Sequence, residues 1–121
     1  MNWPKTLDEA VDFVLANIST EDKNTLVKTK EKSLISFHHG FGTFIRNELG
    51  LWSDNKELLN AIEQHPDYLS MLKQYNIKSD MIMKVNGAIH PDDASMVIIK
   101  AVWKKLHTKS QTRYQILKET I

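Results

Sequence analysis

The chain has no cysteine among its 121 residues. This absence excludes a disulfide framework, a zinc site with cysteine ligands and a thiol nucleophile. It fits a reducing compartment, and we expect a cytoplasmic protein.

Long hydrophobic runs are also missing. No apolar stretch approaches the roughly 20 residues that a bilayer-spanning helix needs. The first ten residues, MNWPKTLDEA, lack the apolar centre of a signal peptide. The sequence therefore predicts no membrane partner.

Charge is nearly balanced overall but uneven along the chain. The formal net charge is +1, with 41% hydrophobic and 26% charged residues, which is typical of one globular domain spanning residues 1–121. The stretch from Lys100 to Ile121 holds six Lys or Arg and one Glu. A basic end of this kind is usually a solvated helix face, so we do not expect a nucleic-acid partner.

Strand-like alternation is absent, and the apolar residues recur at helical spacing instead. Thr6 and Glu9 form a capping box that starts a first helix, which continues to about Ile18. A second helix starts at Ser19 and ends near Lys28. The sequence predicts an all-α, compact single-domain bundle of about five to seven helices.

A third helix is predicted from about Lys32 to Leu49, with Gly50 as the residue after its end. Its apolar face would hold Ile35, His38, Gly42, Ile45 and Leu49. Phe37, Phe41 and Phe44 would widen that face. A fourth helix should follow a cap among Ser53, Asp54 and Asn55.

The later elements begin with the tripeptide His-Pro-Asp, which occurs at His65 and again at His90. Proline and aspartate favour the first turn of a helix, so both copies predict helix starts. Asn86-Gly87 predicts a turn. Asp92 is the expected N-cap of a helix that is apolar nearly all round and therefore central. The range 108–121 should contain a separate C-terminal helix, starting at about Thr112.

Two glycines inside the third helix need an explanation, because glycine costs about 1 kcal/mol there relative to alanine. Gly42 is expected to admit close packing of another helix, through Trp103. The alternative is that a ligand approaches the backbone at Gly40. Trp52 and Trp103 are expected in the core.

The polar residues of the same helix suggest a site or a structural network. His38 lies on the apolar face and is expected to be a buried structural residue. His39 would share a face with Thr43 and Arg46, a group that could bind an anion. The alternative is a salt bridge from Arg46 to Asp92 or Asp93.

No set of residues predicts a catalytic or metal centre. His90, Asp92 and Asp93 lack the spacing of a metal motif. A Ser95, His38 and Asp93 triad is conceivable only on paper, because triads are defined by geometry. Gly40-x-Gly42 lacks the strand and third glycine of a phosphate loop. We predict no cofactor, no metal and no catalytic residue.

Four stretches together resemble a family of small bacterial proteins known only as a domain of unknown function. They are PKTLDEAVDFVLANISTEDK, FHHGFGTFIRNELGLW, the Asn-x-x-Leu-Leu at Asn55–Leu59, and HPDDASMVIIKAVWKKL. The resemblance implies a compact helical domain and a family-variable insertion over 65–89. It also implies family motif positions at His38, Gly42, Arg46, Asn47, Trp52, Asn55, His90, Asp92, Asp93 and Ser95.

Two functions follow as hypotheses. The first is a non-enzymatic interaction or regulatory module whose partner is another protein. The second is a binding protein or enzyme for a phosphorylated or anionic small molecule. An open cleft lined by the polar residues favours the second, and their mutual burial favours the first. The contact residues for either are His39, Arg46, Asn47, His90, Asp92 and Asp93.

Overall fold

A computed structural model describes residues 2–74, 76–78, 84–85 and 88–120, with side chains described as far as residue 108 except at 84 and 85. Its elements in chain order are α1 (Leu7–Asn17), α2 (Thr20–Lys28), the 3₁₀ helix η1 (Glu31–Phe37), α3 (Phe41–Glu48), α4 (Lys56–Glu63), α5 (Pro66–Gln74), β1 (Lys84–Val85), β2 (Ala88–Ile89) and α6 (Pro91–Thr120). The prediction of an all-α fold is confirmed.

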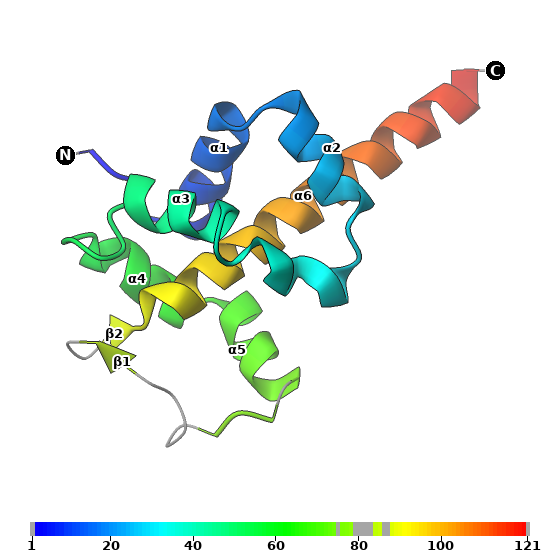
Figure 1. Cartoon of the computed structure of the whole chain (residues 1–121). Coiled ribbons are helices and arrows are strands. Elements are labelled where there is room, and N and C mark those ends of the chain that lie inside the picture. The colour runs from blue at the N-terminus through cyan, green and yellow to red at the C-terminus, as the bar shows by residue number, and fades with distance from the viewer. Residues whose placement is uncertain (1, 75, 79–83, 86–87, 121) are drawn as a thin grey trace.

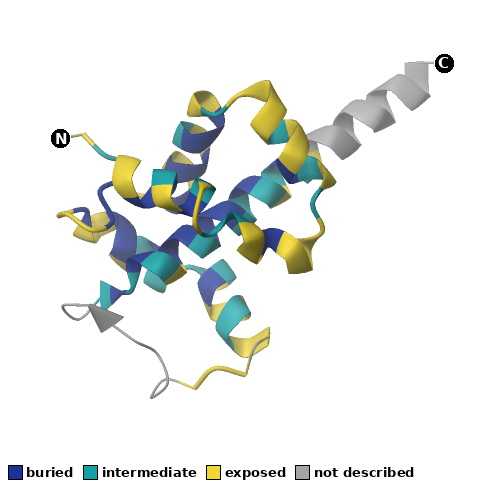
Figure 2. Cartoon of the chain, viewed as in Figure 1, coloured by how far each residue is buried: buried dark blue, intermediate teal, exposed yellow. Residues whose placement is uncertain are grey.

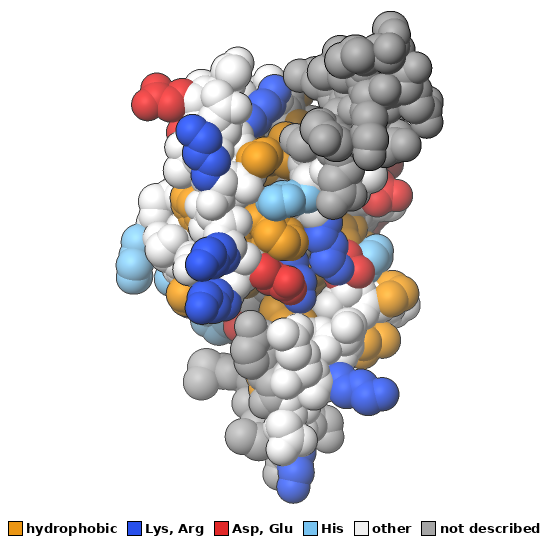
Figure 3. All heavy atoms as spheres, turned by 90° about the vertical axis from the view of Figure 1, so that its right-hand side faces the viewer, with side chains coloured by type: hydrophobic (Ala, Val, Ile, Leu, Met, Phe, Trp, Pro, Cys, Tyr) orange, Lys and Arg blue, Asp and Glu red, His pale blue; other side chains and the backbone are white. Residues whose placement is uncertain are grey.

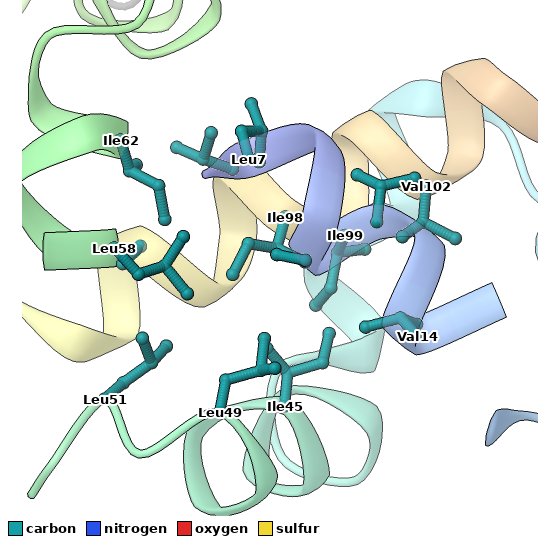
Figure 4. Packing of buried hydrophobic residues seen from close by; sticks show 14 of the residues in the cluster. Leu7, Val14, Ile45, Leu49, Leu51, Leu58, Ile62, Ile98, Ile99 and Val102 are labelled. Carbon is teal, nitrogen blue, oxygen red and sulfur yellow. The ribbon is translucent and has the colours of Figure 1, made fainter. Parts of the chain in front are cut away.

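Helix α6 is the central element. It crosses the domain diagonally in Figure 1 and contacts α1, α2, η1, α3, α4 and α5. Ile98, Ile99 and Val102 on α6 are fully buried, and Figure 4 shows them between the apolar side chains of α1, α3 and α4. Buried residues accordingly gather where these helices meet, as Figure 2 shows. The predicted central helix is confirmed.

Helices α1 and α2 begin where their capping residues predict. The Thr6 hydroxyl accepts a hydrogen bond from the Glu9 backbone N–H at 3.1 Å, and the Ser19 hydroxyl accepts from Asp22 N–H at 3.0 Å. The Glu9 carboxylate accepts from the backbone of Lys5, one residue before the cap. These bonds satisfy N–H groups that a helix start leaves free.

The predicted continuous helix from Lys32 to Leu49 is wrong. The segment is a 3₁₀ helix, a turn at 38–40 and then α3. Two low-propensity glycines allow the break, and the His38 carbonyl accepts a hydrogen bond from the Arg46 side chain. Ile35 is consequently 64% exposed instead of lying on a buried helix face.

The end of α3 follows the expected glycine pattern. Gly50 has φ of +65°, its N–H bonds to the Asn47 carbonyl, and Leu51 N–H bonds to the Arg46 carbonyl. This pair of bonds is a Schellman motif. The Trp3 ring lies directly against Gly50, so only a residue without Cβ fits between the ring and the backbone. Through this contact, Trp3 holds the N-terminal segment against the end of α3.

Helix α4 is capped by Asn55, the third of the three expected candidates. Its buried amide donates to the carbonyls of Pro4 and Leu49, and its oxygen accepts from Leu58 N–H. One side chain therefore joins the N-terminal segment, the end of α3 and the start of α4.

The remaining elements extend the bundle. Helix α5 begins at Pro66 as predicted, and β1 and β2 form a short antiparallel ladder that the sequence did not predict. The predicted turn at 86–87, and 79–83 within the uncertain middle segment, lie outside the described residues. No separate C-terminal helix forms, because α6 continues unbroken to Thr120 and its last turns extend away from the bundle in Figure 1.

Candidate functional site

The predicted polar residues meet where the turn before α3 faces the start of α6, and Arg46 is at the centre. Its Nη1 donates to Ser95 Oγ at 3.0 Å, and its Nη2 donates to the His38 carbonyl at 3.1 Å and to Thr43 Oγ1 at 3.0 Å. Its Nε lies 3.6 Å from Asp92 Oδ1. The salt-bridge hypothesis is confirmed, with Asp92 as the partner, and the guanidinium is a buried structural group with a partner on each nitrogen.

The absence of a side chain at Gly42 leaves the space that the Arg46 guanidinium occupies. A Cβ at Gly42 would lie 2.8 Å from Arg46 Nη1 and 3.4 Å from the Phe37 carbonyl oxygen. The expectation that Trp103 packs on Gly42 is therefore wrong, although the expected structural role of close approach holds. At Gly40 a Cβ would meet nothing within 4 Å.

Three basic side chains lie within 4 Å of the Asp92 carboxylate. Besides Arg46, His38 Nε2 lies 3.9 Å and His90 Nδ1 3.8 Å from Asp92 Oδ2. Nδ1 of His38 is buried and has no hydrogen-bond partner among the described residues. The ring of His38 is thus largely enclosed, as a structural histidine would be, and it faces the Asp92 carboxylate.

Both His-Pro-Asp copies are helix starts, but the histidine is the cap. Nδ1 of His90 accepts from Asp92 N–H at 3.0 Å, and Nδ1 of His65 accepts from Asp67 N–H at 3.1 Å. The prediction that Asp92 caps α6 is therefore wrong. An imidazole acceptor replaces the usual short polar side chain, with proline in the first helical position.

Asp93, the next residue of α6, interacts electrostatically with Tyr68 of α5. Desolvation raises the pKa of Asp93, and the neighbouring Asp92 raises it further, whereas His90 and His38 oppose the shift. Burial raises the pKa of the Tyr68 phenol, and the charge of Asp93 adds to this. Among the described residues, no Lys or Arg forms an ion pair with Asp93, whereas Arg46 pairs with Asp92.

The structure does not bring two of the predicted contact residues into this network. His39 lies exposed in the turn, where its ring meets the His38 ring edge-on at 5.1 Å. Asn47 is exposed on α3, and its side chain forms no hydrogen bond with the described residues. His39 contributes only its carbonyl, which accepts from the Thr43 hydroxyl.

The two tryptophans differ in burial. Trp103 is half-buried, donates its indole N–H to the Thr29 carbonyl at 2.8 Å, and packs on His107. Trp52 is 53% exposed, so its predicted place in the core is wrong. Its ring meets His90 edge-on with centroids 5.2 Å apart, because the turn after Gly50 carries it to the surface beside the start of α6.

The polar residues of this junction bind mainly one another. The Ser95 hydroxyl is fully buried, donates to the Asp92 carbonyl and accepts from Arg46, so it is not available as a nucleophile. Among the described residues, no group of three or more His, Asp or Glu side chains is placed to hold a metal ion. Arg46 and Ser95 thus bind other protein groups, while the Asp92 side chain remains 43% exposed.

Sequence reasoning missed an open groove between α1, α2 and α3. The Phe groove, as we name it, has a volume of about 410 Å³ and is lined by Asn17, Ile18, Asp22, Thr25, Leu26, Phe37, Gly40, Phe41 and Phe44. The Phe37 and Phe41 rings meet edge-on at 6.4 Å, and the Phe41 and Phe44 rings are parallel within 8° at 6.3 Å. Three phenylalanines within eight residues were the available signal, but they were assigned to packing.

A known protein family matches the part of the chain that contains most of these elements. Residues 3–76 match a family described as a domain of unknown function, DUF6794. The chain belongs to the DUF6794 family. The matched range includes α1 to α5, and therefore Arg46 and the whole Phe groove, whereas Asp92 and Ser95 lie beyond it. No curated protein and no solved structure is significantly similar to the chain.

Within the described residues, no helix combines the length and hydrophobicity required to cross a bilayer. This holds for α6 as well, which is long but strongly charged.

Proposed function

We propose that this DUF6794 domain is a non-enzymatic protein-interaction module that binds a segment of a partner protein in the Phe groove. The observation that carries the proposal is the contrast between two regions. Arg46 and Ser95 are buried and bonded to protein groups, while the Phe groove is open and lined by three half-buried aromatic rings.

Aromatic side chains favour this use of the groove. Phenylalanine is enriched at protein interfaces, where its ring buries a large apolar area at a small cost in conformational entropy. Phe37, Phe41 and Phe44 come from the end of η1 and from α3, so they are held by regular elements and need little ordering on binding. On the face in Figure 3, by contrast, apolar side chains are interrupted by charged ones.

The alternative, binding of an anionic small molecule, has less support. Its main cation would be Arg46, and every nitrogen of that guanidinium already has a protein partner. His39 and Asn47 lie outside the network. A phosphate could reach Arg46 only by displacing Ser95 or Asp92, which would open the junction between α3 and α6.

The test uses a variant that fills the groove without disturbing the fold. Gly40 has φ of −81° and open space at its Cβ position, so Gly40→Leu should fold normally and place a side chain in the groove. Ile35→Ser removes an exposed apolar side chain outside the groove and is the matched control. Proteins captured from the native host are identified, purified and measured by calorimetry against wild type and both variants.

We expect a direct partner to bind wild type and Ile35→Ser alike and to lose at least about tenfold in affinity for Gly40→Leu, which corresponds to about 1.4 kcal/mol. Circular dichroism and thermal melting establish that the variants are folded. A purified partner that binds Gly40→Leu as tightly as wild type contradicts the proposed docking site.

A further inference from the structure

The polar side chains that line the Phe groove present mostly acceptors, and the second N–H of the Asn17 amide is the one side-chain donor among them without a described partner. The Asn17 amide donates to the Phe13 carbonyl at 2.7 Å, and the Thr25 hydroxyl donates to the Glu21 carbonyl at 3.0 Å. Asn17 uses one of its two N–H donors and Thr25 uses its only O–H donor on their own helices, which leaves the Asn17 carbonyl oxygen, its second N–H and the Thr25 lone pairs for an occupant.

Asp22 adds a charge to this rim. Its backbone N–H is bound to the Ser19 cap, but its carboxylate forms no hydrogen bond or ion pair with any described residue. No lysine or arginine is among the residues that line the groove. The groove therefore combines aromatic rings, neutral acceptors and one unpaired carboxylate, with no compensating cation.

We propose that the partner segment inserts an arginine side chain into the Phe groove, with its guanidinium at Asp22 and its aliphatic stem along Phe41 and Phe44. This inference rests on the proposed function and specifies the chemistry of the partner. A guanidinium carries five donors and no acceptor, which complements a rim composed mostly of acceptors. It also stacks on aromatic rings and is more weakly hydrated than an ammonium group.

Other occupants fit these groups less well. An acidic or phosphorylated segment would bring like charge to Asp22 and would find only the second N–H of Asn17 as a donor among the lining side chains. A purely apolar segment would cover Asn17, Asp22 and Thr25 without replacing the hydrogen bonds that water makes to them, and this loss opposes binding. Arginine satisfies both the apolar and the polar parts of the groove.

Two peptides separate charge from shape. The probes are acetyl-Leu-Arg-Leu-amide and its citrulline counterpart, in which a neutral urea group replaces the guanidinium at nearly the same size. Each is titrated at millimolar concentration into ¹⁵N-labelled domain, and the amide shifts of groove residues give the affinity. The variants are Asp22→Asn, Gly40→Leu and Asp8→Asn. Asp8 is the matched control because it also lies in the first turn of a helix and is exposed.

We expect the arginine peptide to shift the amides of Thr25, Phe41 and Phe44 and to bind about five- to tenfold more tightly than the citrulline peptide. Asp22→Asn should remove this difference, Asp8→Asn should leave it unchanged, and Gly40→Leu should abolish binding of both peptides.

The failures of the two proposals are distinguishable. Equal affinities for the two peptides, both lost in Gly40→Leu, would overturn the arginine assignment and leave the docking groove in place. The arginine assignment is also overturned if Asp8→Asn weakens binding as much as Asp22→Asn. Shifts confined to residues outside the groove, or no shifts with either peptide, would overturn the groove as a peptide site as well.

Discussion

The guanidinium of Arg46 and the hydroxyl of Ser95 share a buried hydrogen bond of 3.0 Å between residues 49 positions apart. The bond joins α3 to the first turn of α6. The same guanidinium also binds the turn before α3, through the His38 carbonyl. One side chain thus connects α3, the turn before it and the start of α6.

Arg46→Ala should destabilise the domain by about 2–4 kcal/mol, because it leaves buried hydrogen-bonding groups and the Asp92 carboxylate without their partner. Equilibrium urea unfolding measures this. Asn47→Ala, next to it but exposed, is the control and should change stability by less than about 0.5 kcal/mol. Equal stabilities of Arg46→Ala and wild type would show that the network contributes nothing to folding.

Gly42→Ala tests whether the glycine is present for the guanidinium. In the wild-type background the new methyl group would lie 2.8 Å from Arg46 Nη1, and displacing it should cost more than the roughly 1 kcal/mol that alanine gains in helix propensity. We expect a net loss of about 1 kcal/mol.

The same change in an Arg46→Ala background should reverse sign, because the obstacle is gone. Gly42→Ala should then stabilise by about 0.5–1 kcal/mol, and a double-mutant cycle measured by urea unfolding gives the difference. A loss of similar size in both backgrounds would instead identify the Phe37 carbonyl as the constraint.

Local capping signals were sufficient to predict several helix ends. Thr6, Ser19 and Gly50 act through bonds within six residues, so their roles can be inferred from sequence alone. The apolar residues of α1 and α6 also recur with a period that identifies the buried faces.

The prediction of one continuous helix from Lys32 to Leu49 failed because of distant partners, and two others failed for local reasons. The break at 38–40 is stabilised by the Arg46 side chain, whose contacts with Ser95 and Asp92 no local pattern contains. Trp52 is exposed because the turn after α3 carries it outward, although hydrophobicity alone predicts burial. The capping role of His90 was missed because histidine is an uncommon N-cap, and the two adjacent acids were the better local candidates.

Gly50→Ala should be among the most destabilising single methyl additions in the chain. The position combines φ of +65° with a Trp3 ring whose Cε2 would lie 2.5 Å from the new Cβ. We expect a loss of about 2–4 kcal/mol from strain and displacement of the ring. In a Trp3→Ala background only the strain remains, and the cost should fall to about 1–2 kcal/mol. An unchanged cost in that background would assign the whole effect to the backbone.

Asp93→Asn should raise the melting temperature at pH 7. Desolvation raises the pKa of Asp93 in the folded state, so folding disfavours its ionised form, and the wild type is penalised at any pH above that folded value. The penalty disappears as pH falls below the pKa of the unfolded chain, because the carboxyl is then neutral in both states. The advantage of Asp93→Asn should therefore shrink on acidification, as thermal melts between pH 7 and pH 3 would measure.

Asp92→Asn is the contrasting variant and should lower the melting temperature at pH 7, because Asp92 is the carboxylate that Arg46, His38 and His90 surround. The two substitutions should thus change stability in opposite directions: Asp92 pairs with the Arg46 guanidinium, whereas Asp93 interacts with Tyr68, whose phenol pKa its charge helps to raise. Equal destabilisation by both substitutions at pH 7 would contradict this prediction. Asp93 would then stabilise the start of α6 through a favourable interaction with the helix dipole, as Asp92 can.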